Sequence, residues 1–203
     1  SRTANVTGWV DERNQLNRNG WQAKQLVGIP WRVAFALQAE GWYLRSDIIW
    51  AKPNPMPESV TDRPTKAHEY VFLLAKQGQY YYDAQAIAEP VSLATGNVGF
   101  DGRWDREHRS EMLTRNKRSV WTVNTEPYSG AHFATFPEAL VEPCLLAGCP
   151  LGGRVLDPFC GTGTTVAVAE RLGRIGIGMD LSYQALARDR TAQRGFRWDV
   201  AVS

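Results

Sequence analysis

Residues 155–173 read VLDPFCGTGTTVAVAERLG and combine the residue types of a ligand-binding turn. An apolar run leads to Asp157, then to Gly161 and Gly163, and then to a segment with helical spacing. Glycines let a backbone approach a ligand closely, and the helix that follows points its first N–H groups at the same place. Because ligands of open α/β folds bind where parallel strands end, we expect a binding site at this turn.

Asp180 ends the next expected strand, 23 residues after Asp157. A carboxylate in this position can accept hydrogen bonds from a ribose diol, so the segment 154–180 predicts half of a nucleoside site. A dinucleotide fingerprint would have glycine where Val166 stands. Asp157 at the tip of the first strand suits a cation, such as the ammonium of a methionine moiety, better than a pyrophosphate. The pattern therefore favours S-adenosylmethionine over NAD, with a tight turn that binds nothing as the alternative.

Alternating apolar strands and helices surround this turn and predict an α/β fold with a mostly parallel sheet covered by helices. The expected strands are 43–50, 69–76, 119–123, 154–159 and 174–180, with 78–83 as a partner or extension. The expected helices are 23–39, 136–148, 162–173 and 182–194. In the first helix Pro30 lies in the first turn, and helical spacing is shared by Leu26, Ile29, Val33, Ala36 and Leu37. The prolines of 51–59 indicate a loop.

The composition allows one globular domain and excludes several classes of protein. Of 203 residues, 23 are Lys or Arg and 21 are Asp or Glu, so a net charge of +2 does not by itself indicate nucleic acid. Cys144, Cys149 and Cys160 lack metal-binding spacing and suit the reduced thiols of a cytoplasm. The sequence shows no signal peptide and no apolar run near the ~18 residues of a membrane span.

The segment DPFCGTGTT (157–165) resembles motif I of the β-type amino-group DNA methyltransferases, usually written DPFxGSGTT. Residues 132–146 resemble their motif X helix, 175–182 resemble motif II, and 47–76 resemble a strand, an NPMP loop and an HE strand of that family. The resemblance covers roughly residues 21–190. It implies a Rossmann-like, S-adenosylmethionine-dependent methyltransferase fold with a permuted motif order, in which the catalytic half precedes the cofactor half.

This order predicts three regions within one domain. Residues 1–83 would be the rear part of the catalytic region, 84–118 a target-recognition insertion, and 119–203 the region that binds S-adenosylmethionine. By resemblance, the backbone of the turn and Asp157 would hold the methionine end of the cofactor, and Asp180 its ribose. The implied cofactor residues are Asp157, Pro158, Phe159, Gly161, Gly163, Thr164 and Asp180, faced by His132, Thr135, Phe136 and Pro137.

The family's catalytic motif is an acid, serine or asparagine followed by Pro-Pro and an aromatic residue, and this sequence lacks it. NPMP (54–57) has no adjacent prolines, and TEPY (125–128) follows the recognition region. We expect the catalytic strand to precede Ser1, so that the isolated chain is inactive and the fold is incomplete at its N-terminus. A catalytically inactive or split-subunit relative is the alternative. Without the motif, the choice between adenine and cytosine stays open.

By resemblance, the partner would be double-stranded DNA, with no metal and no membrane, and with either a second copy of the chain or a missing N-terminal half. The candidate DNA contacts are Lys52, Asn54, Arg63, Lys66, Arg103 and Arg118, with Arg106, Arg109, Arg115 and Lys117 as further cations. A solvated mixed-charge face is the alternative for each. The expected setting is the cytoplasm of a bacterium, in a phage, prophage or restriction-modification context. A nicotinamide-dependent oxidoreductase is a further alternative, which Val166 opposes.

Overall fold

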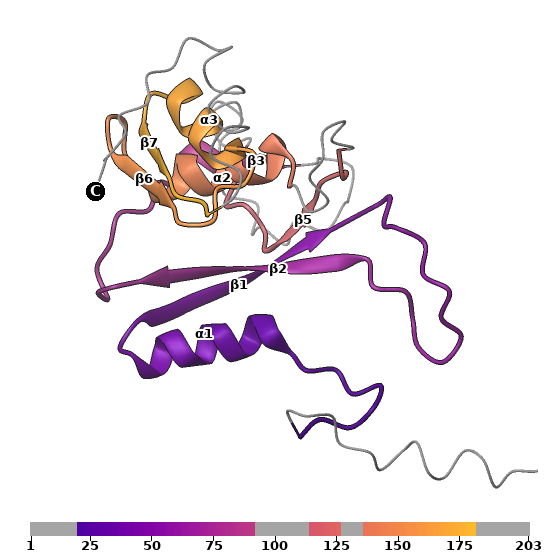
Figure 1. The fold of residues 1–203 in the computed structure, drawn as a ribbon. Coiled ribbons are helices and arrows are strands. Elements are labelled where there is room, and N and C mark those ends of the chain that lie inside the picture. The colour runs from indigo at the N-terminus through magenta and orange to yellow at the C-terminus, as the bar shows by residue number, and fades with distance from the viewer. Residues whose placement is uncertain (1–19, 92–113, 127–135, 182–203) are drawn as a thin grey trace, which may run out of the picture.

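The computed structural model describes residues 20–91, 114–126 and 136–181 (Figure 1). In chain order the elements are α1 (Ile29–Ala39), β1 (Tyr43–Ala51), β2 (His68–Ala75), the 3₁₀ turn η3 (Gln85–Ile87), β3 (Glu89–Pro90), β4 (Thr114–Arg115), β5 (Val120–Thr122), α2 (Glu138–Gly148), β6 (Arg154–Asp157), α3 (Thr164–Arg171) and β7 (Ile175–Gly178). The expected strands and helices in these ranges are confirmed, apart from 78–83. The expected helix 182–194 lies outside the described residues.

The described strands form three sheets, ordered β2-β1-β5, β3-β4 and β6-β7. β1 is antiparallel to β2 and parallel to β5, β6 is parallel to β7, and β3 is antiparallel to β4. The pairing is therefore less uniformly parallel than the sequence predicted. The reason lies in the connections, because the proline-rich loop 52–67 contains no helix that could return the chain for a parallel partner. Between β6 and β7, α3 provides that crossover.

Helix α1 begins six residues later than predicted, at Ile29 rather than residue 23. Gly28 precedes it in the left-handed conformation, with a φ of 69°, and this interrupts the helix. The packed face also differs from the predicted one. Trp31 contacts the rings of β2, and Ala34 is buried, whereas Ile29 and Val33 are 58% and 53% exposed.

Residues 78–83 form no strand, contrary to the prediction. The backbone N–H of Asp83 donates to the carbonyl of Ala147 at 2.9 Å, so this segment ends against α2 rather than beside β2. The Asp83 carboxylate then accepts from the N–H of Ala86 at 2.9 Å and holds the start of η3. The run of tyrosines is thereby used in a connection between β2 and the β3-β4 pair.

Helix α2 joins the two main parts of the molecule. In Figure 1 α1 lies on one side of β1 and β2, and α2, α3, β6 and β7 gather on the other. Leu140 of α2 packs with Trp50 and Trp121 of the β2-β1-β5 sheet. Other α2 residues form a second cluster with α3, made of Val141, Leu145, Val168 and Ala169. No helix in the described ranges is long and apolar enough to cross a membrane.

Helix α3 approaches β7 so closely that glycine is required in the strand. A Cβ atom on Gly176 would lie 2.9 Å from both the Cα and the carbonyl oxygen of Val166. The side chain of Glu170 also accepts a hydrogen bond from the Gly176 N–H at 2.8 Å. This contact sets the distance between the helix and the strand on either side of the glycine turn.

We predict that Gly176→Ala destabilises the protein by about 1–3 kcal/mol, because the added methyl group overpacks against backbone atoms that cannot rotate away. Urea denaturation measures the difference. Gly148→Ala is the matched control, since a Cβ at the end of α2 meets nothing within 4 Å. Equal free energies of unfolding for the two variants would contradict the close packing of α3 on β7.

Candidate functional site: a glycine turn and a DNA-facing loop

The glycine turn continues directly from the β6-β7 ladder. Beyond the last strand pair, the N–H of Met179 donates to the carbonyl of Asp157 at 2.8 Å, and the N–H of Cys160 donates to the carbonyl of Met179 at 2.9 Å. Asp157 also accepts the N–H of Phe159 on its carboxylate at 3.0 Å, which curls the chain out of the strand. Gly163 has a φ of 78° and is the N-cap of α3.

The two acids predicted from the sequence meet at this turn. A carboxylate oxygen of Asp180 accepts the N–H of Gly161 at 3.0 Å, so the end of β7 holds the turn that follows β6. Asp157 and Asp180 are both half-buried. Their combined negative charge is felt by the thiol between them, since burial first, and then Asp157 and Asp180, raise the pKa of Cys160. The turn is thus a site of negative potential.

The remaining predicted cofactor residues divide into three groups. Phe159 is 85% exposed beside the turn, and Pro158 is exposed as well. Thr164 is buried at 4% exposure, with its hydroxyl 3.3 Å from that of Thr162, so it stabilises the turn from inside. Phe136 is 38% exposed and Pro137 is the buried N-cap of α2. His132 and Thr135 lie outside the described residues.

On the other part of the molecule, loop 52–67 carries the predicted DNA contacts. Lys52 forms an ion pair with Glu69, and its ammonium lies 4.3 Å from the centroid of the Trp50 ring. Arg63 forms an ion pair with Glu58 at 2.8 Å. Lys66 and Lys52 line a hollow of about 370 Å³ at the start of β2, together with Pro30, Pro55, Met56, Glu58, His68, Glu69 and Tyr70.

The two described ends of the predicted recognition insertion are joined by charge. Glu89 of β3 accepts from the guanidinium of Arg115 at 3.1 Å and from that of Arg118 at 2.6 Å. The Arg118 guanidinium first, and Arg115 with it, hold the pKa of Glu89 below its usual value. Lys117 lies 5.3 Å from the centroid of the Trp121 ring. Arg103, Arg106 and Arg109 lie outside the described residues.

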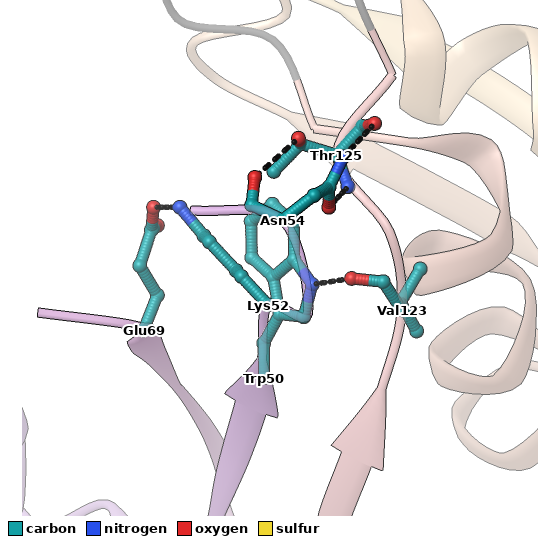
Figure 2. Close-up of polar contacts among 6 residues, drawn as sticks. All are labelled: Trp50, Lys52, Asn54, Glu69, Val123 and Thr125. Atoms are coloured by element: carbon teal, nitrogen blue, oxygen red, sulfur yellow. Dashed lines mark hydrogen bonds and ion pairs between the residues drawn. The ribbon is translucent and has the colours of Figure 1, made fainter. Parts of the chain in front are cut away.

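Sequence reasoning missed the partner of Asn54. Its carboxamide binds the backbone of Thr125, 71 residues later, and Figure 2 shows this contact beside Trp50 and Lys52. The flanking residues Pro53 and Pro55 are the signal that could have indicated it, because a backbone without N–H donors needs a side chain to replace them. Across the described residues, no cluster of three or more histidines, cysteines or acids is arranged to hold a metal ion.

The comparison with protein families identifies the chain. A family profile described as DNA methylase, covering N6 and N4 enzymes, matches residues 7–189. The chain belongs to this family. Its members methylate amino groups of DNA bases, and the resemblance inferred from the motifs is confirmed, together with the Rossmann-like α/β fold class.

Similar proteins include Type II methyltransferases. This methylase chain is 51% identical over 177 residues to M.SmaI of Serratia marcescens, a match that covers 86% of the chain and 55% of that protein. It is 50% identical over 163 residues to M.Cfr9I of Citrobacter freundii, covering 80% and 48%. The chain therefore spans about half the length of these curated relatives.

Solved structures agree on the fold. The cytosine-N4-specific PvuII DNA methyltransferase superimposes with a TM-score of 0.60 at 21% identity, covering 88% of this methylase chain and 62% of the other. A second structure, a DNA modification methylase of Thermus thermophilus solved in complex with S-adenosyl-L-methionine, gives a TM-score of 0.55 at 25% identity, covering 85% and 63%.

We predict a pH signature for the Glu89 ion pairs of this methylase. The folded-state pKa of Glu89 lies below the ordinary value of 4.5, so its stabilising effect is complete above that value and is lost as the pH falls through the folded-state pKa. Glu89→Gln should therefore be less stable than the parent at pH 7 and equally stable once the pH lies below the folded-state pKa. Thermal unfolding from pH 3 to 7 measures this, with the exposed acid change Glu40→Gln as control. A stability difference that persists unchanged at the lowest pH would contradict the ion pairs.

Proposed function

We propose that this chain forms the cofactor-binding and DNA-binding portion of a Type II DNA methyltransferase, which transfers a methyl group from S-adenosylmethionine to the exocyclic amine of adenine or cytosine. The observation that carries the proposal is the meeting of Asp157 and Asp180 at the glycine turn, with Asp180 bonded to Gly161. Family membership supports the reaction class. The relatives named Type II methyltransferases support a restriction-modification setting.

The residues of the turn fit S-adenosylmethionine. This molecule carries an ammonium and a sulfonium, and the two carboxylates that raise the pKa of Cys160 create a potential that favours a cationic ligand. A pyrophosphate would be repelled by the same potential, which argues against NAD. In the proposed site Asp157 holds the methionine end and Asp180 the ribose, and the half-exposed ring of Phe136 faces the pocket. His132 and Thr135 keep their predicted places in it.

When bound, the cofactor supplies an electrophilic methyl group. Transfer forms a bond from the exocyclic nitrogen to the methyl carbon and breaks the bond from that carbon to sulfur, which leaves as a thioether. The amine loses one proton. The Pro-Pro-aromatic motif that would receive the base in this family is missing from these 203 residues. We therefore propose that the isolated chain binds the cofactor but needs the remaining half, or a partner subunit, to methylate DNA.

The DNA is double-stranded in this proposal, and it lies along loop 52–67 and the insertion 84–118. Lys52, Arg63 and Lys66 would contact phosphates, with Arg103 and Arg118 on the insertion. Because several of these cations are paired with acids in the structure, DNA must compete with Glu58, Glu69 and Glu89 for them. The proposed location is the bacterial cytoplasm, with a homodimer as the alternative to a missing N-terminal half.

We predict that the chain binds S-adenosylmethionine and that Asp180→Ala weakens binding by roughly 10–100-fold, the effect of losing charged hydrogen bonds of about 1.5–3 kcal/mol. Isothermal titration calorimetry measures the Kd. The matched control is Asp62→Ala, which removes an exposed acid paired with Lys24 and should leave the Kd unchanged. Binding of NAD in place of S-adenosylmethionine, or equal affinity in both variants, would contradict the assignment of the site.

A further inference from the structure

The parallel ladder between β1 and β5 ends where the prolines begin. Its last backbone bond runs from the N–H of Val123 to the carbonyl of Ala51 at 3.1 Å. Pro53 and Pro55 follow in the β1 chain, and neither has an N–H to donate. Proline at 55 also restricts Asn54 to extended conformations. The backbone of 53–55 thus offers few donors with which to continue the ladder toward β5.

The side chain of Asn54 continues it instead (Figure 2). Its carbonyl oxygen accepts the N–H of Thr125 at 3.0 Å, and its amide nitrogen donates to the carbonyl of Thr125 at 3.3 Å. The Thr125 hydroxyl donates to the Asn54 backbone carbonyl at 3.4 Å. We call this pair of residues the clasp. A carboxamide is suited to it because it presents one acceptor and one donor to the same residue's backbone, whereas a carboxylate only accepts.

The clasp is anchored by buried apolar packing. Shortly before the prolines, Trp50 is 4% exposed and donates its indole N–H to the carbonyl of Val123 at 2.8 Å. Trp50 packs with Leu140 of α2. The clasp therefore ties loop 52–67, on the proposed DNA side, to segment 123–126, which leads along the chain toward α2 and the helix behind the glycine turn.

We propose that Asn54 is a positioning residue for methyl transfer. Through the clasp it fixes loop 52–67 against segment 123–126, so that DNA held by the loop keeps a set distance from the cofactor held by the glycine turn. This inference rests on the proposed function above. It assigns Asn54 to the backbone of Thr125, in place of the direct DNA contact expected from the sequence. Because productive transfer needs reacting atoms within about 3–3.5 Å, a loose loop lowers kcat more than it lowers cofactor affinity.

The test uses the complete methyltransferase that contains this chain, with Asn54→Ala, Asn54→Asp and the exposed amide control Gln38→Ala. We expect both Asn54 variants to lower kcat by roughly 10–100-fold. The KM for S-adenosylmethionine should change by less than about threefold, because the glycine turn lies on the other part of the molecule. Asn54→Asp should resemble Asn54→Ala, since a carboxylate oxygen cannot donate to the Thr125 carbonyl. Gln38→Ala should match the parent.

Hydrogen exchange of the Thr125 amide provides a readout in this chain itself. We expect at least about tenfold faster exchange in Asn54→Ala, because its acceptor is removed. Unchanged exchange, a parental kcat in Asn54→Ala, or a parallel loss of kcat, cofactor affinity and melting temperature would each overturn the positioning role. A parent enzyme that binds S-adenosylmethionine yet labels no DNA would instead overturn the proposed function, and this outcome is visible before any variant is made.

Discussion

The indole of Trp50 lies where three parts of the chain meet, and the arrangement of the molecule depends on it. It is buried among Trp121 of β5 and Leu140 of α2, and its N–H satisfies the carbonyl of Val123. A tryptophan can do this because its large apolar body packs while its single polar atom finds a partner. Truncating it would leave a cavity and an unpaired carbonyl at the joint between the β2-β1-β5 sheet and α2. From that joint α2 passes the packing on to α3 and to the glycine turn.

The glycine turn itself could be predicted because its determinants are local. The strand, the acid, the glycines and the helix follow one another within 154–171, and each residue type has one main structural use. The second acid, Asp180, could be predicted from its place at the end of the next strand. The structure adds what spacing alone does not contain: Asp180 also holds the turn through the N–H of Gly161.

Features that depend on distant partners could not be predicted in the same way. The start of α1 was misplaced because apolar spacing continues through Gly28, whose left-handed conformation interrupts the helix. The segment 78–83 has strand composition, yet its end is taken by the carbonyl of Ala147 on α2. The clasp joins residues 71 positions apart, and no periodicity marks it. Similarly, the sequence presents Arg115 and Arg118 as cations, whereas the fold places Glu89 between them.

The proposal that these parts cooperate in methylating DNA is tested most directly by finding the methyl group. The complete protein would be incubated with unmodified DNA and S-adenosylmethionine labelled in the methyl group, and the DNA would be digested to nucleosides and analysed by mass spectrometry. Our account predicts label on the exocyclic amine of cytosine or adenine, and the product identifies which of the two is the target. A folded protein that binds the cofactor but leaves every nucleoside unlabelled would contradict it.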